Sequence, residues 1–412
     1  MTAGAPPAFS SRWLEPPAHV SERPGGGLAA GFRASGVAAG IKPSGDPDLA
    51  LLVCSQPDAA SAARFTRSGA PAAPVLLCRE RCRLDALRAV VANSGNANAA
   101  TGNRGLEDAA RMQGAGAMAA GVHEDQVAVA STGVIGVPMP MDGVTRGILD
   151  ARGALAPDGD RAFWRAIATT DAFEKLLSLD VALPSGSVRL SAQAKGAGMI
   201  QPGFATMLCF VQTDAALAAE TAELLLGVCV KRSFDRITVD GQLSTSDVAL
   251  LIASGASGVV VAPESEDELR FGEALDYALR RLALQVVRDG EGAARIGRVH
   301  VHGGHDATVE RVARAIANSP LVKAALHGGD PNWGRVAQSI GAALPSMEPI
   351  PFDIWIEGVH VCAGGVALPH EPPRMGEEVE YVVGLPGEGA ETEVFFSDLS
   401  HDYVRINAEY TT

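Results

Sequence analysis

Short apolar runs separated by glycine-rich turns recur along the chain and predict strands. Runs of four to eight apolar residues are typical of buried strands, and apolar–polar alternation is typical of strands with one exposed face. Strands are therefore predicted within residues 28–54, 73–82, 87–95, 126–133, 187–200, 207–215 and 298–303. Most of 350–412 is also predicted to be strand, including the final "INAEYTT".

Other segments have apolar residues three and four positions apart, which predicts amphipathic helices. Such helices are predicted within residues 107–122, 160–175, 215–234, 266–293 and 306–328. The second should end near Thr169 or Thr170. Asp289-Gly290 should end the fourth, because glycine favours the position just after a helix, and Pro320 should break the fifth.

The chain has 412 residues, of which 47% are hydrophobic and 20% are charged. A globular chain of this length is expected to form two or three domains. Because strands and helices are mixed, we predict an α/β (α+β) layered sandwich. Residues 1–291 would form a catalytic region, and residues 292–412 a smaller C-terminal α/β domain.

The formal net charge of −14 disfavours electrostatic binding of nucleic acid or an anionic membrane. No apolar stretch reaches the roughly 18 residues that a membrane span needs, and the N-terminus lacks the pattern of a signal peptide. The six cysteines have no zinc-site spacing, and Cys209 and Cys229 lie in apolar runs that predict buried thiols. We therefore expect a cytoplasmic protein.

Several familiar motifs are absent from the sequence. It contains no G-x-S-x-G elbow and no phosphate-binding G-x-x-x-x-G-K-[ST] loop. "HVHGGH" offers His300, His302 and His305, and histidines two apart share one face of a strand. A metal site is one interpretation of this stretch. A strand that runs into a glycine turn explains it more simply, so no metal site is predicted.

Three glycine turns display polar groups. "NSGNANAATGN" (93–103) gathers asparagines, and "STGVIG" (131–136) places the Thr132 hydroxyl beside the Gly133 N–H after a strand. Two adjacent donors of this kind are able to hold a developing oxyanion. "DPNWGR" (330–335) predicts a turn that exposes polar groups and an aromatic ring. Each stretch is equally compatible with a simple turn.

The stretch "QPGFATMLCFVQTDA" (201–215) raises a sharper hypothesis about Thr206. A threonine becomes a nucleophile only when a base accepts its proton, and no histidine lies within sixty residues of Thr206. Its own α-amine, with a pKa of about 8, would serve if the Ala205–Thr206 bond were broken. The small Ala205 leaves room for the hydroxyl to attack the preceding carbonyl. The alternative is that Thr206 is an ordinary strand residue.

The segment "AKGAGMIQPGFATMLCFVQTDA" resembles the cleavage segment of the ornithine acetyltransferase (glutamate N-acetyltransferase) family, whose pattern is close to K-G-S-G-M-I-x-P-N-M-A-T-M-L. Seven further stretches resemble family motifs in the right order and extend the resemblance over nearly the whole chain. They are "NSGNANAATG", "ASTGVIG", "AIATTD", "SFDRITVDGQLSTSD", "DGEGA", "NSPLVKAALHGGDPNWGR" and "INAEYTT".

The resemblance implies a role for each matching residue. Thr206 would be the nucleophile and, after self-cleavage between Ala205 and Thr206, the first residue of a β chain. Thr132 and Gly133 would form the oxyanion hole. Substrate would be bound by Thr169 or Thr170, Lys195, Thr206, Glu291, Asn407 and Thr412. These residue types suit an amino-acid substrate, since Lys195 can pair with a carboxylate and Glu291 with an ammonium group.

The family's reaction transfers acetyl from N2-acetyl-ornithine to glutamate through an acetyl-Thr206 ester, without a metal or bound cofactor. The resemblance leaves open whether acetyl-CoA also serves as a co-substrate. It further implies a place in cyclic arginine biosynthesis. The assembly it implies is a heterotetramer of two α chains (1–205) and two β chains (206–412).

The sequence departs from the family pattern at several positions. Gly203-Phe204 replaces Asn-Met before the predicted cut, and Ala172 replaces a threonine. Asp235 replaces an asparagine, Gln242-Leu243 replaces Asp-Thr, and Ala324 replaces a threonine. None of these positions is predicted to be catalytic, so they bear on substrate preference more than on reaction type.

Three alternatives remain open at this point. A self-cleaving aminopeptidase or amidase would use water in place of glutamate as the acceptor. A relative in natural-product biosynthesis would use another substrate. A protein that binds amino acids without catalysis would keep an uncut chain.

Overall fold

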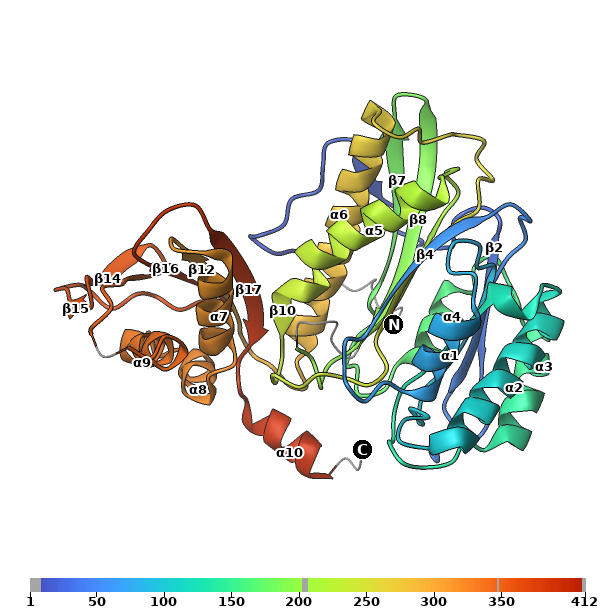
Figure 1. The fold of residues 1–412 in the computed structure, drawn as a ribbon, viewed down its shortest axis with the longest axis horizontal. Helices are drawn as coiled ribbons and strands as arrows, with labels where there is room; N and C mark the ends of the chain where they lie inside the picture. The colour runs from blue at the N-terminus through green and yellow to red at the C-terminus, as the bar shows by residue number, and fades with distance from the viewer. Residues whose placement is uncertain (1–8, 202–206, 347, 410–412) are drawn as a thin grey trace, which may run out of the picture.

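The computed structural model describes residues 9–201, 207–346 and 348–409. Within these ranges the strands form sheets of six, seven and four strands (Figure 1). The layered α/β architecture confirms the predicted fold class. No helix in the described ranges is long and apolar enough to cross a membrane.

The six-stranded sheet forms the centre of the larger part of the molecule. In spatial order it contains β1 (Val20–Glu22), β7 (Leu176–Leu183), β8 (Gly186–Lys195), β9 (Leu208–Thr213), β11 (Val248–Ala253) and β4 (Ala60–Phe65). Every residue of β9 is buried, and successive side chains enter opposite cores. Cys209 and Val211 lie in one core, and Leu208 and Phe210 lie in the other. This alternation follows from the two-residue period of a strand.

The four-stranded sheet packs on the side of the six-stranded sheet that Leu208 and Phe210 face. Its strands are β2 (Phe32–Val37), β3 (Leu49–Cys54), β5 (Ala89–Asn93) and β6 (Val127–Ser131), and its helices are α1 (Ala73–Arg81), α2 (Gly102–Ala120), α3 (Met141–Gly153) and α4 (Asp160–Ile167). Helix α4 contacts strands of both sheets, and the ring of Phe163 meets that of Phe210 edge-on.

The opposite face of the six-stranded sheet is covered by α5 (Ala219–Arg232) and the long helix α6 (Glu266–Asp289) (Figure 1). Ser265 caps α6 by accepting a hydrogen bond from the Glu268 N–H. The helix ends at Asp289, as Asp289-Gly290 predicted. A Cβ atom at Gly290 would lie 2.7 Å from that of Ser397, so there is no room for a side chain at this position.

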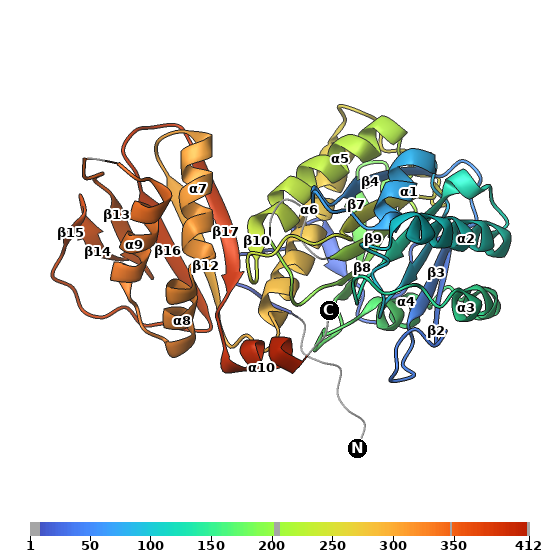
Figure 2. The ribbon, with the colours of Figure 1, turned by 60° about the horizontal axis from the view of Figure 1, so that its bottom comes forward.

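The seven-stranded sheet lies to the left in Figure 1, with α7 (Asp306–Ala317), α8 (Pro320–Gly328) and α9 (Trp333–Ala343) packed against it. Its strands, in spatial order, are β10 (Ile237–Thr238), β17 (Glu391–Ser397), β12 (Ile296–His302), β16 (Glu378–Gly384), β13 (Asp353–Ile356), β14 (Val359–Ala363) and β15 (Val366–Ala367). Helix α10 (His401–Glu409) leaves this sheet and runs back beside the end of α6 (Figures 1 and 2). The domain division at residue 291 remains a prediction.

Two strand predictions are wrong. Residues 73–81 form helix α1, because Pro74 sits in the first helical turn, where its missing N–H costs nothing, and the apolar side of the helix packs on α2 and β6. Residues 401–409 form α10, so the described part of "INAEYTT" is helical. Within "DPNWGR", Asn332 caps helix α9, which was not predicted.

Candidate active site

Seven of the predicted site residues line one cavity, although they are spread over more than half of the chain. They are Thr132, Gly133, Thr169, Thr170, Lys195, Glu291 and Asn407. Ala97, Ile135, Gly198, Met199 and Ser244 to Ser246 complete the wall. Ala205, Thr206 and Thr412 lie outside the described residues, so the structure does not place them relative to this cavity.

The Thr132-Gly133 turn follows directly from the end of β6. Its Thr132 N–H donates to the Asn93 carbonyl oxygen over 3.0 Å, which fixes the turn against the loop after β5. Gly133 has φ = 130°, and a Cβ atom there would lie 2.4 Å from the carbonyl carbon of Gly95. Only glycine fits this position. No hydrogen bond from the Gly133 N–H to another described residue is found outside helices and strands.

Lys195, the last residue of β8, is buried beside this turn. Its Nζ donates to Thr132 Oγ1 over 2.6 Å and lies 3.4 Å from Thr169 Oγ1. Burial lowers the pKa of Lys195 to about 8, although the negative charges of Asp171 and Asp247 oppose the shift. Because Thr132 Oγ1 accepts from the lysine, the Thr132 hydroxyl hydrogen can point elsewhere and donate to a third group.

Beneath the cavity lies a charged cluster that the sequence analysis did not identify. The Nζ atom of Lys175 donates to Asp171 Oδ1 over 2.6 Å and also bonds to Asp289. All three side chains are almost completely buried. Although burial opposes it, the positive charges of Lys175 and Lys195 lower the pKa of Asp171 to about 2. Burial, the larger influence at Asp289, raises the pKa of that carboxyl.

The two carboxylates of this cluster hold the backbone that carries the site. Asp171 accepts hydrogen bonds from the N–H groups of Thr169 over 3.0 Å and Gly196 over 2.8 Å. Asp289 accepts one from the Ala172 N–H. The cluster therefore fixes the threonine pair, the residue after Lys195 and the end of α6. Its partners are up to 117 residues apart, which is why no local pattern revealed it.

Glu291 projects into the cavity from the turn after α6. Its backbone has φ = 47°, an uncommon conformation for a residue with a side chain. Thr170 Oγ1 donates to its Oε1 over 2.9 Å, and Asn407 Nδ2 on α10 donates to its Oε2 over 2.5 Å. A Cβ atom at Gly198 would lie 2.5 Å from the Glu291 carboxylate, so a side chain at this position would displace that carboxylate. Both Thr169 and Thr170 thus line the cavity, with different partners.

Another buried carboxylate marks the start of β9. The Met207 N–H donates to Asp247 Oδ1 over 3.0 Å, and burial raises the pKa of Asp247 well above its usual range. Met207 is covalently bonded to Thr206, so Asp247 anchors the residue that follows the predicted nucleophile. Ser244 to Ser246, which line the cavity, immediately precede Asp247.

The histidines considered as metal ligands do not form such a site. The rings of His300 and His302 lie 5.9 Å apart, and His300 Nε2 is 3.3 Å from Glu391 Oε2. Across the described ranges, no group of three or more histidine, cysteine, aspartate or glutamate side chains is placed to hold a metal ion. Strand β12 contains His300 and His302, and the turn at Gly303-Gly304 follows it.

Comparison with known proteins gives concordant matches over nearly the full length. The model of the ArgJ family matches residues 33–412. The arginine biosynthesis bifunctional protein ArgJ of Symbiobacterium thermophilum is 41% identical over 392 residues, which span 93% of this chain and 97% of that protein. Its counterpart in Geobacter sulfurreducens is 43% identical over 391 residues, 93% of this chain and 99% of that protein.

Solved structures of similar chains also exist. The crystal structure of ornithine acetyltransferase complexed with ornithine, from Mycobacterium tuberculosis, is 38% identical in sequence. It matches 44% of this chain and 98% of its own chain, with a TM-score of 0.41.

Proposed function

This chain belongs to the ArgJ family, and we propose that it transfers the acetyl group of N2-acetyl-ornithine to glutamate through an ester on Thr206. It is an ornithine acetyltransferase of arginine biosynthesis. The proposal concerns how the residues of this chain carry out that activity. The observation that supports it most is the contact of Lys195 Nζ with Thr132 Oγ1, beside Gly133 and in one cavity with Glu291.

The first step of the proposal creates the catalytic base. The Thr206 hydroxyl attacks the carbonyl carbon of Ala205, the peptide C–N bond breaks, and an ester forms between the two residues. Water hydrolyses that ester, which leaves a carboxylate on Ala205 and a free α-amine on Thr206. The pKa of such an amine is about 8, so a useful fraction is neutral near physiological pH.

Acetyl transfer then proceeds in two symmetrical halves. The Thr206 oxygen attacks the acetyl carbonyl carbon while the α-amine of Thr206 accepts the hydroxyl proton. The oxyanion that forms lies between the Thr132 hydroxyl and the Gly133 N–H. The α-amine returns the proton to the departing nitrogen, so ornithine leaves and acetyl-Thr206 remains. The α-amine of glutamate then attacks the ester carbonyl carbon, and the Thr206 α-amine transfers its proton to the Thr206 oxygen as the acetyl C–O bond breaks. N-acetyl-glutamate leaves, and the Thr206 hydroxyl is restored.

Lys195 has a supporting role in the oxyanion site. A positive charge that donates to Thr132 Oγ1 polarises the hydroxyl and makes it a stronger donor. Because the pair is buried, water does not screen this influence. Lys195 would also attract the carboxylate of either amino-acid substrate.

Glu291 is proposed to recognise the side-chain ammonium of ornithine. Thr170 and Asn407 occupy one site on each carboxylate oxygen, which fixes the orientation of the carboxylate and leaves further acceptor positions for the ligand. The C-terminal carboxylate of Thr412 is proposed as a further substrate contact. We also propose that acetyl-CoA serves as a second acetyl donor and that the protein is cytoplasmic. Its proposed assembly is a heterotetramer of two 1–205 and two 206–412 chains.

Intact mass spectrometry combined with a transfer assay tests this mechanism. Purified protein should consist of residues 1–205 and 206–412, and Thr206→Ala should give one uncut chain without transfer. Thr206→Ser should still be cut, since it keeps the hydroxyl. Thr145→Ala is a matched control, because the Thr145 hydroxyl bonds only within α3, to the Met141 carbonyl.

A Thr206→Ala chain that is still cut between 205 and 206 would overturn the self-cleavage step. The acceptor is tested by measuring ornithine release with and without glutamate. Release that does not depend on glutamate would identify a hydrolase instead.

A further inference from the structure

Asp240 joins the cavity wall to helix α10. Its Oδ2 accepts from the Met199 N–H over 2.6 Å, and its Oδ1 accepts from the Ile200 N–H over 2.9 Å. The Tyr403 hydroxyl on α10 donates to Oδ2 over 3.2 Å. Tyr403 and Asp240 are 163 residues apart, and Met199 lines the cavity.

The two N–H groups that bind Asp240 belong to an unusual stretch of backbone. Met199 has φ = 58°, in the left-handed region that side chains disfavour. Successive N–H groups around such a residue form a concave anion site, which a carboxylate fills well. Asp240 therefore stabilises the conformation that brings Gly198 and Met199 to the wall of the cavity.

Tyr403 lies one helical turn before Asn407. Asn407 Nδ2 donates to the Tyr403 carbonyl oxygen over 3.0 Å as well as to Glu291 Oε2. Glu291 in turn packs against Gly198, the neighbour of Met199. The contacts thus form a closed ring from Asp240 through Tyr403, Asn407 and Glu291 back to the segment that Asp240 holds.

We propose that Asp240 is a positioning residue for recognition of the substrate's side-chain ammonium. Asp240 is not among the described residues that line the cavity. It sets the distance between the Gly198–Met199 wall and α10, and so holds the Glu291 carboxylate in one orientation through Asn407. The inference rests on the proposed function, in which Glu291 pairs with that ammonium.

The experiment compares two acetyl donors that differ only in this group. N2-acetyl-norvaline has the carbon chain of N2-acetyl-ornithine but lacks the terminal amine. The measured quantity is the ratio of kcat/KM for the ornithine donor to kcat/KM for the norvaline donor. General damage to the fold lowers both values, whereas loss of Glu291 orientation lowers only the first.

Tyr403→Phe removes one hydroxyl and keeps the ring. We expect the ratio to fall about five- to tenfold, which is within the range typical of the loss of one hydrogen bond, mainly through a higher KM for the ornithine donor. Tyr277→Phe is the matched control, because the Tyr277 hydroxyl also faces a carboxylate, Glu22 at 3.3 Å, away from the cavity. Its ratio should equal that of the wild type.

Asp240→Asn should lower the ratio at least as much as Tyr403→Phe, since an amide cannot accept from both N–H groups and the tyrosine alike. A wild-type ratio in either variant would overturn the inference. Glu291→Gln calibrates the assay and should abolish most of the preference. If Glu291→Gln keeps the wild-type ratio, the ammonium assignment within the proposed function is wrong, and that failure is distinguishable from failure at Asp240.

Discussion

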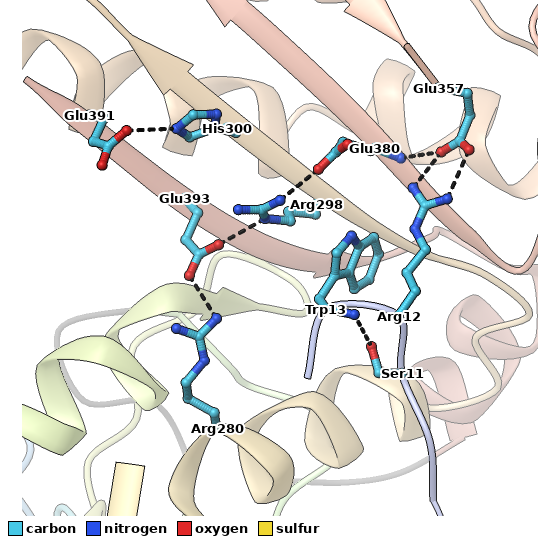
Figure 3. Close-up of polar contacts among 10 residues, drawn as sticks. All are labelled: Ser11, Arg12, Trp13, Arg280, Arg298, His300, Glu357, Glu380, Glu391 and Glu393. Atoms are coloured by element: carbon cyan, nitrogen blue, oxygen red, sulfur yellow. Dashed lines mark hydrogen bonds and ion pairs between the residues drawn. The ribbon is translucent and has the colours of Figure 1, made fainter. Parts of the chain in front are cut away.

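Two networks of charged side chains in this molecule have similar chemistry but opposite surroundings. One is the buried cluster of Asp171, Lys175 and Asp289 beneath the cavity. The other lies on the face of the seven-stranded sheet (Figure 3), where Arg298 contacts Glu380 over 2.6 Å and Glu393 over 2.8 Å. Both join segments that are far apart in the sequence.

The surface network continues across the sheet and toward α6. Arg280 on α6 donates to Glu393 over 2.9 Å, and Arg12 contacts Glu357 over 2.7 Å at the other end of the view (Figure 3). Arg298 is 26% exposed, whereas Lys175 is fully buried. Exposed ion pairs are screened by water and salt, so each stabilises the fold little.

The buried cluster differs because its charged groups are not solvated by water. Removal of one member leaves an uncompensated charge in the interior, which lowers the free energy of unfolding far more than loss of a surface pair does. Its carboxylates also accept backbone N–H groups from the segments that carry Thr169, Ala172 and Gly196. Charge burial here therefore fixes the geometry of a site, whereas the surface network only adds modest contacts between elements.

Lys175→Met should lower the stability of the protein most. The substitution leaves the carboxylates of Asp171 and Asp289 buried without their shared cation, so the free energy of unfolding should fall by about 3–5 kcal/mol. Urea unfolding of the purified variant measures this loss. A loss below about 1 kcal/mol would mean that the buried cluster behaves like the surface network.

Thr132→Ala tests whether the buried residues around the cavity contribute to catalysis as well as to stability. Loss of one oxyanion donor typically lowers turnover about 100- to 1,000-fold, which corresponds to about 3–4 kcal/mol in the barrier. The measurement is kcat for acetyl transfer, with circular dichroism to show that the fold persists. His300→Ala, on the surface of the sheet, is the control and should retain wild-type turnover. Wild-type turnover in Thr132→Ala would show that the turn is purely structural.

Acid titration separates the networks further. The pKa of Asp171 is about 2 in the folded protein, below the 3.8 of a free aspartate, so this carboxylate stabilises the fold above about pH 4. That contribution, about 2 kcal/mol, should disappear as the pH falls toward 2. The difference in unfolding free energy between wild type and Asp171→Asn should therefore shrink over this range. A difference that does not change with pH would contradict the assigned ion pair.

Arg298→Met should have the smallest effect. Since the Arg298 guanidinium is partly exposed, the free energy of unfolding should fall by less than about 1 kcal/mol. In about 1 M salt the Debye length is about 3 Å, and the remaining difference from wild type should become smaller. A loss as large as that of Lys175→Met would show that exposure does not decide the strength of these networks.

Secondary structure was predictable wherever the apolar pattern was long or clearly periodic. Helices α5, α6 and α7, the break at Pro320 and the buried strands β5, β6 and β9 were all predicted. Residues 73–82 were not, because a short run such as "APVLL" has no period that distinguishes a strand from one side of a helix. Packing against α2 and β6 decided that α1 is a helix.

The family and the candidate residues of the site could be predicted from the sequence alone, since motifs in a fixed order along the chain can be recognised without knowledge of the fold. The sequence also placed Thr132-Gly133 in a turn after a strand, because this is a local feature of backbone conformation. Only the tertiary structure showed that Lys195 donates to Thr132, that Asn407 reaches Glu291 from a helix, and that Asp171, Asp240, Asp247 and Asp289 hold the backbone around them. The physical reason is that the favourable partner of a buried charge is chosen by proximity in space, which the order of residues along the chain does not encode.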